Sequence, residues 1–257
     1  VFGDSDYAAI EARLAAHFSK DHLLIKNFED DLDPHAMTAY HLYDDIVKPA
    51  VDAQFGGPNR EALLWVKANF KDLREKSKTW NYMVVYGGGE QRAMAVFGVT
   101  KEKARDMINS YFETYPGLRR MIEGAHEEAR QNGYITSLLN ARMHIPDIHS
   151  PKFGFRKAAE RQAANGKIQK SAGEIIKMAM ILIHQDPTLR SLGVETLLQV
   201  HDELVFEIPD DEGVKVQAKS ILDDYMSNSY KHFGFRSLRV ATPAEVSYGW
   251  TWGDAKD

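Results

Sequence analysis

Three acidic residues in two separate stretches are the side chains of this sequence best suited to metal-ion chemistry. Asp202 and Glu203 stand between two largely apolar runs, 197–200 and 204–206. β-Branched and aromatic residues around a short polar stretch predict two strands joined by a tight turn, with the acids at its tip. Carboxylates held close together lose solvation and repel each other unless a cation lies between them. An ordinary solvated turn carries such a pair too, and a third acid, Asp6, after another predicted strand is what favours a metal site.

Two cations and two tyrosines form the next pattern that could do chemistry. Arg74, Lys78, Tyr82 and Tyr86 are spaced four residues apart, so they share one face of a predicted helix. Such a face suits a ligand with phosphates at one end and a sugar or planar ring at the other. A solvated basic face that continues into a buried aromatic one gives the same spacing, so both interpretations stay open. The glycines at 87–89 predict the end of the helix and a hinge.

A third pattern lies in a long predicted helix over residues 155–184. Arg161, Asn165 and Gln169 again fall four apart. Side chains of these types can contact base edges in a nucleic-acid groove, although on an isolated helix they also form an ordinary polar face.

Composition limits the classes of protein that can carry these patterns. The 257 residues are enough for a sizeable core, and 44% hydrophobic with 27% charged residues is typical of globular proteins. The net charge of −5 argues against binding nucleic acid by bulk charge, so any such binding must use local basic clusters. The absence of cysteine excludes disulfides and thiolate metal sites. We expect no membrane-spanning segment, because Lys177 interrupts the most apolar stretch, 175–183, and we see no signal peptide.

The elements that must position these residues follow from periodicity and breakers, and by themselves they predict only a mixed α+β protein. The chain starts without Met in a predicted strand, so we expect a fragment or one piece of a split protein. The predicted elements are a strand ending at 6, helices at 7–18 and 35–43, a loop or insertion at 48–58, a helical region at 61–86, helices at 90–97, 101–114 and 118–131, a hairpin at 133–146, a helix at 155–184, the hairpin at 197–207, a helix at 211–232 and an edge strand at 238–248.

These pieces, in this order, resemble the family A DNA polymerases, the bacterial polymerase I-like enzymes and their phage relatives. Four motifs carry the resemblance over nearly the whole chain. They are 6–13 (DYAAIEAR), similar to the first palm motif DYSQIELR; 74–87, similar to the fingers pattern R-x3-K-x3-[FY]-x3-YG; 200–203, which match VHDE; and Glu160, Arg161, Asn165 and Gln169, similar to the palm helix that follows the primer minor groove.

The resemblance implies an α+β fold, a polymerase palm with a small antiparallel sheet plus a helical fingers subdomain. It places palm at 1–33, fingers at 34–132 with an insertion at 48–70, and palm again at 133–257. The last part would hold the primer-contact helix, the VHDE hairpin, and a C-terminal helix and strand. The thumb, the exonuclease-like domain and the first part of the palm would lie upstream.

Three departures from the family pattern stand out. Ala8 and Ala9 replace the usual Ser-Gln, so the hydrogen bonds of that pair are lost. The hairpin at 133–146 keeps only Arg142 of several arginines, and the stretch from His35 to Arg74 is longer than in the relatives.

The implied activity is template-directed addition of deoxynucleotides to a primer 3′ end by two-metal phosphoryl transfer. Asp6 and Asp202 would bridge two Mg²⁺ ions, for which Mn²⁺ can substitute, with the Tyr7 carbonyl as a further ligand. Glu203 would act in the outer shell or as an occasional ligand. Lys78 would be the catalytic proton donor to the leaving pyrophosphate.

The remaining implied roles concern substrate and DNA. The triphosphate would contact His35, Arg74 and Lys78, the sugar and base would contact Tyr82, and the template base would lie near Tyr86. Glu11 would exclude ribonucleotides by sterics. The residues expected to contact primer-template DNA are Thr79, Arg142, Arg161, Asn165, Gln169 and His201. The implied partners are primer-template DNA, dNTPs and an upstream polymerase segment in cis or in trans, and the implied place is the cytoplasm of a bacterial or phage-infected cell.

Three other functions share part of this pattern. A single-subunit RNA polymerase shares the two aspartates and the Lys/Tyr helix, but Glu11 and Glu203 argue against it. A non-catalytic nucleic-acid-binding remnant would explain the negative charge, but not the joint presence of Asp6, Asp202 and Lys78. A two-metal nuclease would have no use for the helix face with Lys78.

Overall fold

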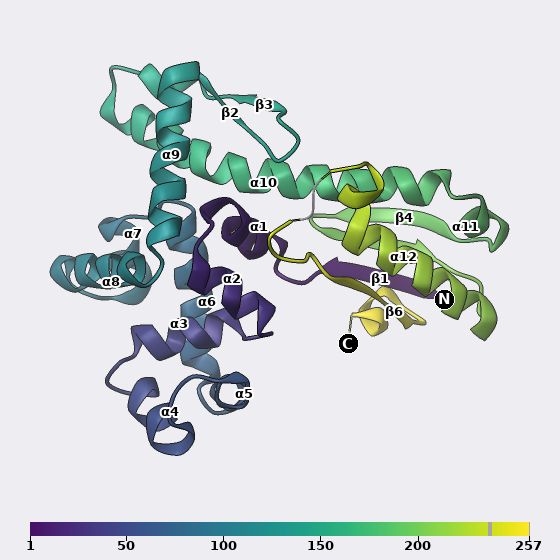
Figure 1. Cartoon of the computed structure of the whole chain (residues 1–257), viewed down its shortest axis with the longest axis horizontal. Helices are drawn as coiled ribbons and strands as arrows, with labels where there is room; N and C mark the ends of the chain where they lie inside the picture. The colour runs from purple at the N-terminus through teal and green to yellow at the C-terminus, as the bar shows by residue number, and fades with distance from the viewer. Residues whose placement is uncertain (236–237, 257) are drawn as a thin grey trace. The chain divides into compact units, whose positions relative to one another are not determined.

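The computed structural model describes residues 1–235 and 238–256, which belong to two compact units (Figure 1). The sheet unit comprises Val1–Leu14 and Gln169–Asp257, and the helical unit comprises Ala15–Ile168. Helices α1 (Ile10–Ser19) and α10 (Phe153–Gln185) each contribute one end to each unit. The predicted fold class, α+β with a small antiparallel sheet, is confirmed.

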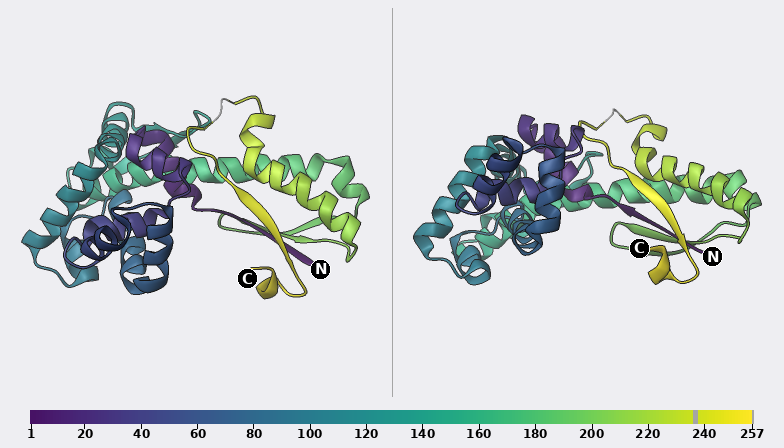
Figure 2. Two further views of the ribbon diagram at one scale, coloured as in Figure 1. Left: turned by 60° about the horizontal axis from the view of Figure 1, so that its bottom comes forward. Right: turned by 90° about the horizontal axis from the view of Figure 1, so that it is seen from below.

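The sheet unit is built on a four-stranded antiparallel sheet in the order β4-β5-β1-β6. Its strands are β1 (Phe2–Tyr7), β4 (Glu195–Val200), β5 (Glu203–Glu207) and β6 (Ala244–Gly249). The first strand in sequence is therefore central, with β6 running beside it in both views of Figure 2. Pairing of chain segments some 200 residues apart gives β1 two strand neighbours, so its backbone is fixed on both sides.

The two faces of this sheet differ in chemistry. Tyr7 and its opposite neighbour Ala244 face helix α12 (Glu212–His232), where the Tyr7 hydroxyl donates to the Met226 carbonyl at 2.7 Å. On the same side of β5, Leu204 and Phe206 are fully buried. Because side chains alternate along a strand, Asp4 and Asp6 point to the other face. The apolar face thus holds the core, and the acids gather on the opposite one.

Short helices complete the sheet unit. α11 (Pro187–Ser191) precedes β4, and α13 (Trp252–Ala255) follows β6. Ser229 on α12 donates to the Ile175 carbonyl of α10 at 3.1 Å, which joins the two long helices inside this unit.

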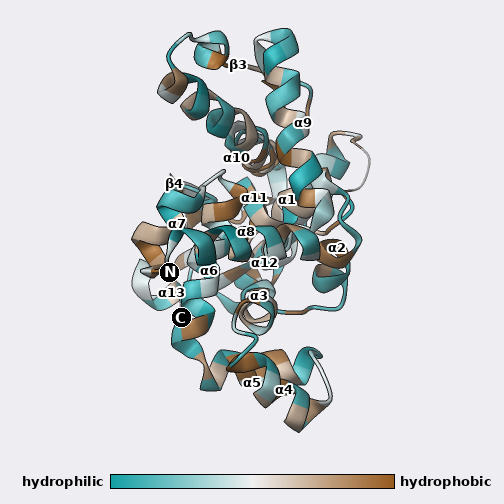
Figure 3. Ribbon diagram, turned by 90° about the vertical axis from the view of Figure 1, so that its left-hand side faces the viewer, coloured by the Kyte–Doolittle hydropathy of each residue, from teal (hydrophilic) through white to brown (hydrophobic). Residues whose placement is uncertain are grey.

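The helical unit carries helices and a small hairpin. They are α2 (His22–Glu29), α3 (Pro34–Leu42), α4 (Val47–Phe55), α5 (Arg60–Asn69), α6 (Lys71–Val85), α7 (Glu90–Phe97), α8 (Lys101–Thr114), α9 (Pro116–Asn132), β2 (Tyr134–Thr136), β3 (Arg142–His144) and the 3₁₀ turn η1 (Pro146–His149). One buried cluster joins α3, α4 and α5, and hydrophobic stretches on α4 and α5 are visible in Figure 3. A second joins α9, the hairpin and α10.

Most predicted elements are confirmed, among them the helices at 90–97 and 101–114, the hairpin at 133–146 and the helix at 155–184. The predicted loop at 48–58 is wrong, because Val47–Phe55 is helix α4. Pro49 lies in the first turn, where a missing N–H costs nothing, and Gly56 at φ 72° ends the helix. α2, η1, α11 and α13 were not predicted. Within the described residues, no helix is long and apolar enough to cross a membrane.

Candidate active site

The acidic face of the sheet centres on Asp6. Antiparallel pairing sets Asp6 opposite Glu203 on β5 and opposite Glu245 on β6, and directly opposite residues share a face. Asp4, two residues earlier on β1, shares that face. Sequence reasoning found Asp6 and Glu203, but Asp4 and Glu245 were missed, although the alternation of residues along β1 was a signal for Asp4.

Asp202 reaches this group from the turn between β4 and β5. His201 and Asp202 form a two-residue loop between the paired residues Val200 and Glu203. His201 has φ 55°, a left-handed conformation that few side chains adopt, and its carbonyl accepts from Gln199 Nε2 at 2.5 Å. The structure therefore places Asp202 at the tip, as predicted, whereas Glu203 is the first residue of β5 and is buried.

Two acids of this group, Asp6 and Glu11, have raised pKa values. Burial raises the pKa of Asp6, and the charges of Asp202 and Glu203 raise it further. Burial and the charge of Asp202 also raise the pKa of Glu11, on the first turn of α1. Asp6 and Glu11 thus ionise less readily because of nearby acids, with the charge of Asp202 acting on both and that of Glu203 acting on Asp6.

Asp4 and Glu203 are hydrogen-bonded to each other, and Asp4 is the one that holds a proton more readily. Burial and a hydrogen bond with Glu203 raise the pKa of Asp4 to about 7. Burial opposes ionisation of Glu203 as well, but hydrogen bonds with Asp4, Lys256 and Trp252 lower its pKa. Asp4 Oδ1 is buried without a hydrogen-bond partner among the described residues, which suits a neutral carboxyl. Glu203 is therefore the ionised member of the pair.

Asp6 and Asp202 offer what a magnesium site requires. Among residues 1–235 and 238–256, no three His, Cys, Asp or Glu side chains are grouped as a metal site of their own. Mg²⁺, however, is commonly held by one or two carboxylates with waters and substrate phosphates completing its shell. Two neighbouring carboxylates with mutual repulsion fit that description, since a divalent cation relieves the repulsion.

In the helical unit, Asp33 organises the predicted phosphate-binding residues. As the N-cap of α3, its Oδ1 accepts from the backbone N–H of His35 at 2.9 Å. Its Oδ2 accepts from Arg74 Nε at 2.9 Å and Nη2 at 2.8 Å. Burial opposes ionisation of Asp33, but the hydrogen bonds from the Arg74 guanidinium and the Ala36 backbone N–H lower its pKa. One carboxylate thus fixes both His35 and Arg74; the sequence signal was an Asp followed by Pro34 at a helix start.

His35 is held in a defined protonation state. Its Nδ1 lies 3.0 Å from Asn81 Nδ2, and with the amide in this orientation Asn81 donates to Nδ1, which leaves the hydrogen of a neutral ring on Nε2. In this amide orientation Asn81 Nδ2 also lies 3.4 Å from the Pro34 carbonyl, and Asn81 Oδ1 lies 2.9 Å from Thr38 Oγ1. Burial lowers the pKa of His35 to about 4; the Asp33 charge opposes this, and those of Arg74 and Lys78 reinforce it. At neutral pH, His35 is an uncharged Nε2–H donor.

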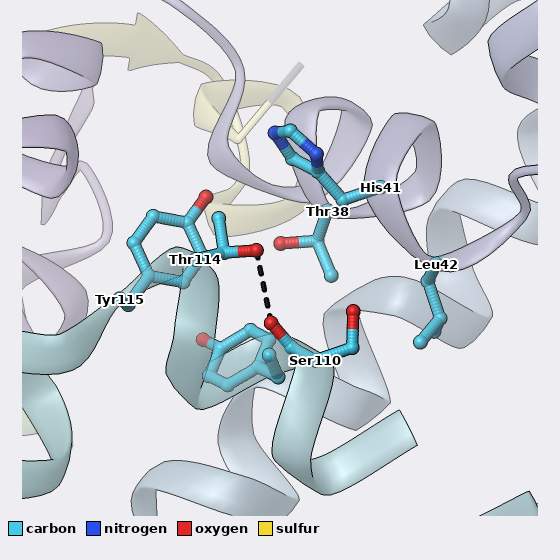
Figure 4. A pocket seen from close by; sticks show the side chains of 7 residues that line it. Thr38, His41, Leu42, Ser110, Thr114 and Tyr115 are labelled. Atoms are coloured by element: carbon cyan, nitrogen blue, oxygen red, sulfur yellow. Dashed lines mark hydrogen bonds between the residues drawn. The ribbon is translucent and has the colours of Figure 1, made fainter. Parts of the chain in front are cut away.

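A pocket beside Thr38 is too small to hold a nucleotide. Its volume is about 10 Å³, room for roughly one water. Figure 4 shows the side chains that line it, with Thr114 donating to the Ser110 carbonyl at 3.0 Å. It is lined by Thr38, His41, Leu42, Ser110, Tyr111, Thr114 and Tyr115.

The tyrosines continue the α6 face away from Arg74. Tyr82 lies 6.0 Å, ring to ring, from His35 and also 6.0 Å from Tyr86. Gly87 follows with φ 71°, and a Cβ there would lie 3.0 Å from Arg161 Cγ. The structure therefore places His35 near Tyr82, Tyr82 near Tyr86, and Arg161 near Gly87. Lys78 and Thr79 are exposed on α6.

The other residues predicted to contact DNA are distributed over both units. Arg142, on β3, is exposed and lies 4.7 Å from the Tyr134 ring. Asn165 and Gln169 continue the α10 line, and the division between the units falls just before Gln169. His201 occupies the turn of the sheet unit. Their contacts with DNA stay predictions.

Comparison with known proteins identifies the family of this chain. The model of the family described as DNA polymerase family A matches residues 1–254. The chain belongs to DNA polymerase family A.

Curated relatives in family A include bacterial polymerases. The chain is 36% identical over 254 residues to DNA polymerase I of Streptococcus pneumoniae, covering 98% of this chain and 26% of that protein. It is 34% identical over 254 residues to the thermostable DNA polymerase I of Thermus thermophilus, covering 98% of this chain and 27% of that protein. The chain thus spans about a quarter of the length of these relatives.

A solved family A structure matches the fold. The POL domain of Pol1 from M. smegmatis, in complex with DNA primer-template and dNTP, has a TM-score of 0.83 and 30% identity. The match covers 100% of this chain and 40% of the M. smegmatis chain.

Proposed function

We propose that this chain is the catalytic part of a template-directed DNA polymerase that extends a primer 3′ end with deoxynucleotides. The observation that supports it most is the cluster of Asp6 and Asp202 on the sheet, in a chain of family A. The proposed cofactor is a pair of Mg²⁺ ions, replaceable by Mn²⁺, held by these two carboxylates and the Tyr7 carbonyl. Bound there, the ions would supply charge neutralisation at the attacking and leaving oxygens.

The chain's own residues would then bind and orient the nucleotide. His35 would donate Nε2–H to a triphosphate oxygen without adding charge, and Arg74, held rigidly by Asp33, would provide a fixed cation. Lys78 would protonate the leaving pyrophosphate. Tyr82 would pack on the sugar, with Tyr86 near the template base.

Residues of the sheet unit have proposed roles of their own. Glu11 would lie below the 2′ position of the sugar and exclude a hydroxyl there. Glu203 would act beside the metal ligands. The residues proposed to contact primer-template DNA are Thr79, Arg142, Arg161, Asn165, Gln169 and His201.

We propose that residues 1–33 and 133–257 form the palm and residues 34–132 the fingers, with an insertion at 48–70. The net charge of −5 leaves little bulk attraction for DNA, so we propose an upstream polymerase segment as partner, in cis or in trans. The place of action would be the cytoplasm of a bacterial or phage-infected cell.

Primer extension by the purified chain, alone and then mixed with candidate upstream segments, tests the proposal. Asp6→Asn and Asp202→Asn each should lower the extension rate by about three orders of magnitude or more, while folding stays intact. Glu207→Gln, at the far end of β5, is the matched control and should keep activity within about twofold. Wild-type-like extension by a folded Asp6→Asn protein would refute the two-metal assignment.

A ribonucleotide comparison separates this proposal from a single-subunit RNA polymerase. We expect dNTPs to be incorporated far better than rNTPs, and Glu11→Ala to reduce that preference. A chain that binds primer-template but extends nothing under any combination would instead be a binding remnant.

A further inference from the structure

The last described segment of the chain reaches back to the acidic face of the sheet. We call Gly249–Lys256 the hook; it contains α13. Trp252 Nε1 donates to Glu203 Oε1 at 2.6 Å, and Lys256 Nζ donates to Glu203 Oε2 at 2.6 Å. Both oxygens of Glu203 are therefore occupied by the hook, and its side chain is only 7% exposed.

The hook is a built element and not a loose end. A Cβ on Gly249 would lie 2.4 Å from the Ala255 nitrogen, so only glycine lets α13 fold against the end of β6. Thr251 and Asp254 cap the helix reciprocally, at 3.2 Å and 2.9 Å. Lys256 Nζ lies 4.8 Å from the Trp252 ring, so the two Glu203 partners support each other.

Lys256 is also a counter-charge for the cluster. Its ammonium interacts most strongly with Glu203 and then with the charges of Asp4 and Asp6. Without it, Glu203 would be an ionised, largely buried carboxylate one strand away from Asp6, its opposite neighbour in the sheet. Such a carboxylate lowers its energy by turning toward a bound cation.

We propose that Trp252 and Lys256 are positioning residues of the active site: they hold the Glu203 carboxylate away from the metal position and offset its charge. This rests on the proposed function, because it assumes that Asp6 and Asp202 hold the metal ions. The hook thereby keeps the number of protein carboxylates on the metal at two and leaves coordination positions for substrate oxygens. Loss of either partner would release Glu203 as an extra ligand.

Loss of a Glu203 partner should strengthen metal binding and slow turnover. Lys256→Met removes one positive charge and should tighten Mn²⁺ binding to the chain by roughly three- to tenfold, as expected for one charge several ångströms away near the surface. Nucleotide addition should slow by about tenfold or more in kcat, with KM for dNTP changed less than about twofold. Trp252→Phe removes the N–H but keeps the ring, and should slow kcat in the same way.

Mn²⁺ binding is measured by electron paramagnetic resonance on the chain without DNA or nucleotide, and turnover by primer extension. Lys256→Arg retains the charge and should restore both quantities. Trp250→Phe, two residues before Trp252 in the chain and 73% exposed, is the matched aromatic control. Lys231→Met on α12, where the ammonium bonds Asn228 at 2.6 Å, is the matched charge control.

Each outcome decides the matter. Tighter Mn²⁺ binding with slower kcat, restored by Lys256→Arg and absent in both controls, supports the proposal. Unchanged or weaker Mn²⁺ binding in Lys256→Met, or parallel changes in the controls, overturns it and leaves the hook a purely structural element. If the unsubstituted chain extends no primer, either alone or mixed with any candidate upstream segment, the proposed function fails, while the Mn²⁺ comparison among folded variants still judges the hook.

Discussion

Protonation of His35 should set part of the acid sensitivity of this protein. Burial and two neighbouring cations lower its pKa from 6.5 to about 4. Between these values the unfolded chain binds a proton at this position and the folded chain does not. Stability from this residue is therefore complete above about pH 6.5 and is lost as the pH falls toward 4.

The size of the effect follows from the shift. Each pKa unit corresponds to about 1.4 kcal/mol, so going from pH 7 to pH 4.5 should cost the folded state about 2 kcal/mol through His35 alone. His35→Gln cannot take up a proton and should lack this component. His41 and His126 also have lowered pKa values, but they contribute equally to both proteins and cancel in the comparison.

Urea unfolding of the wild type and His35→Gln at pH 7 and pH 4.5 measures the difference. The wild type should lose about 2 kcal/mol more than the variant between these pH values. His144→Gln, at an exposed position on β3, is the control and should keep the wild-type dependence. Equal pH dependence of His35→Gln and the wild type would refute the assignment of a buried, neutral imidazole.

Two further predictions concern the α6 face and the turn that ends it. Tyr82→Phe should raise the ratio of kcat/KM for dNTP over ddNTP by about ten- to a hundredfold, because the hydroxyl that replaces a missing 3′-OH is lost; an unchanged ratio would show that the sugar is read elsewhere. Gly87→Ala should lower stability by about 1–2 kcal/mol more than Gly98→Ala in thermal unfolding. Both glycines have positive φ, but only Gly87 has Arg161 in the path of a Cβ; equal losses would contradict this reasoning.

The sequence by itself determined the elements and the order of the motifs. Helical periodicity located α6 and α10, and apolar runs on both sides of a short polar stretch located the β4–β5 hairpin with Asp202 at its turn. These are local properties, set by residues three or four apart in a helix and two apart in a strand. The same local reasoning failed at Pro49. Proline is common both in loops and in the first turn of a helix, so its presence alone does not distinguish the two.

Only the tertiary structure decided which side chains act on one another. Trp252 and Lys256 lie 49 and 53 residues from Glu203 in the chain, yet they occupy both of its oxygens. Asp33 and Asn81 likewise fix Arg74 and His35 across more than forty residues. No spacing rule predicts such contacts, because strand order, register and helix packing determine them, and these depend on burying apolar surface from the whole chain at once.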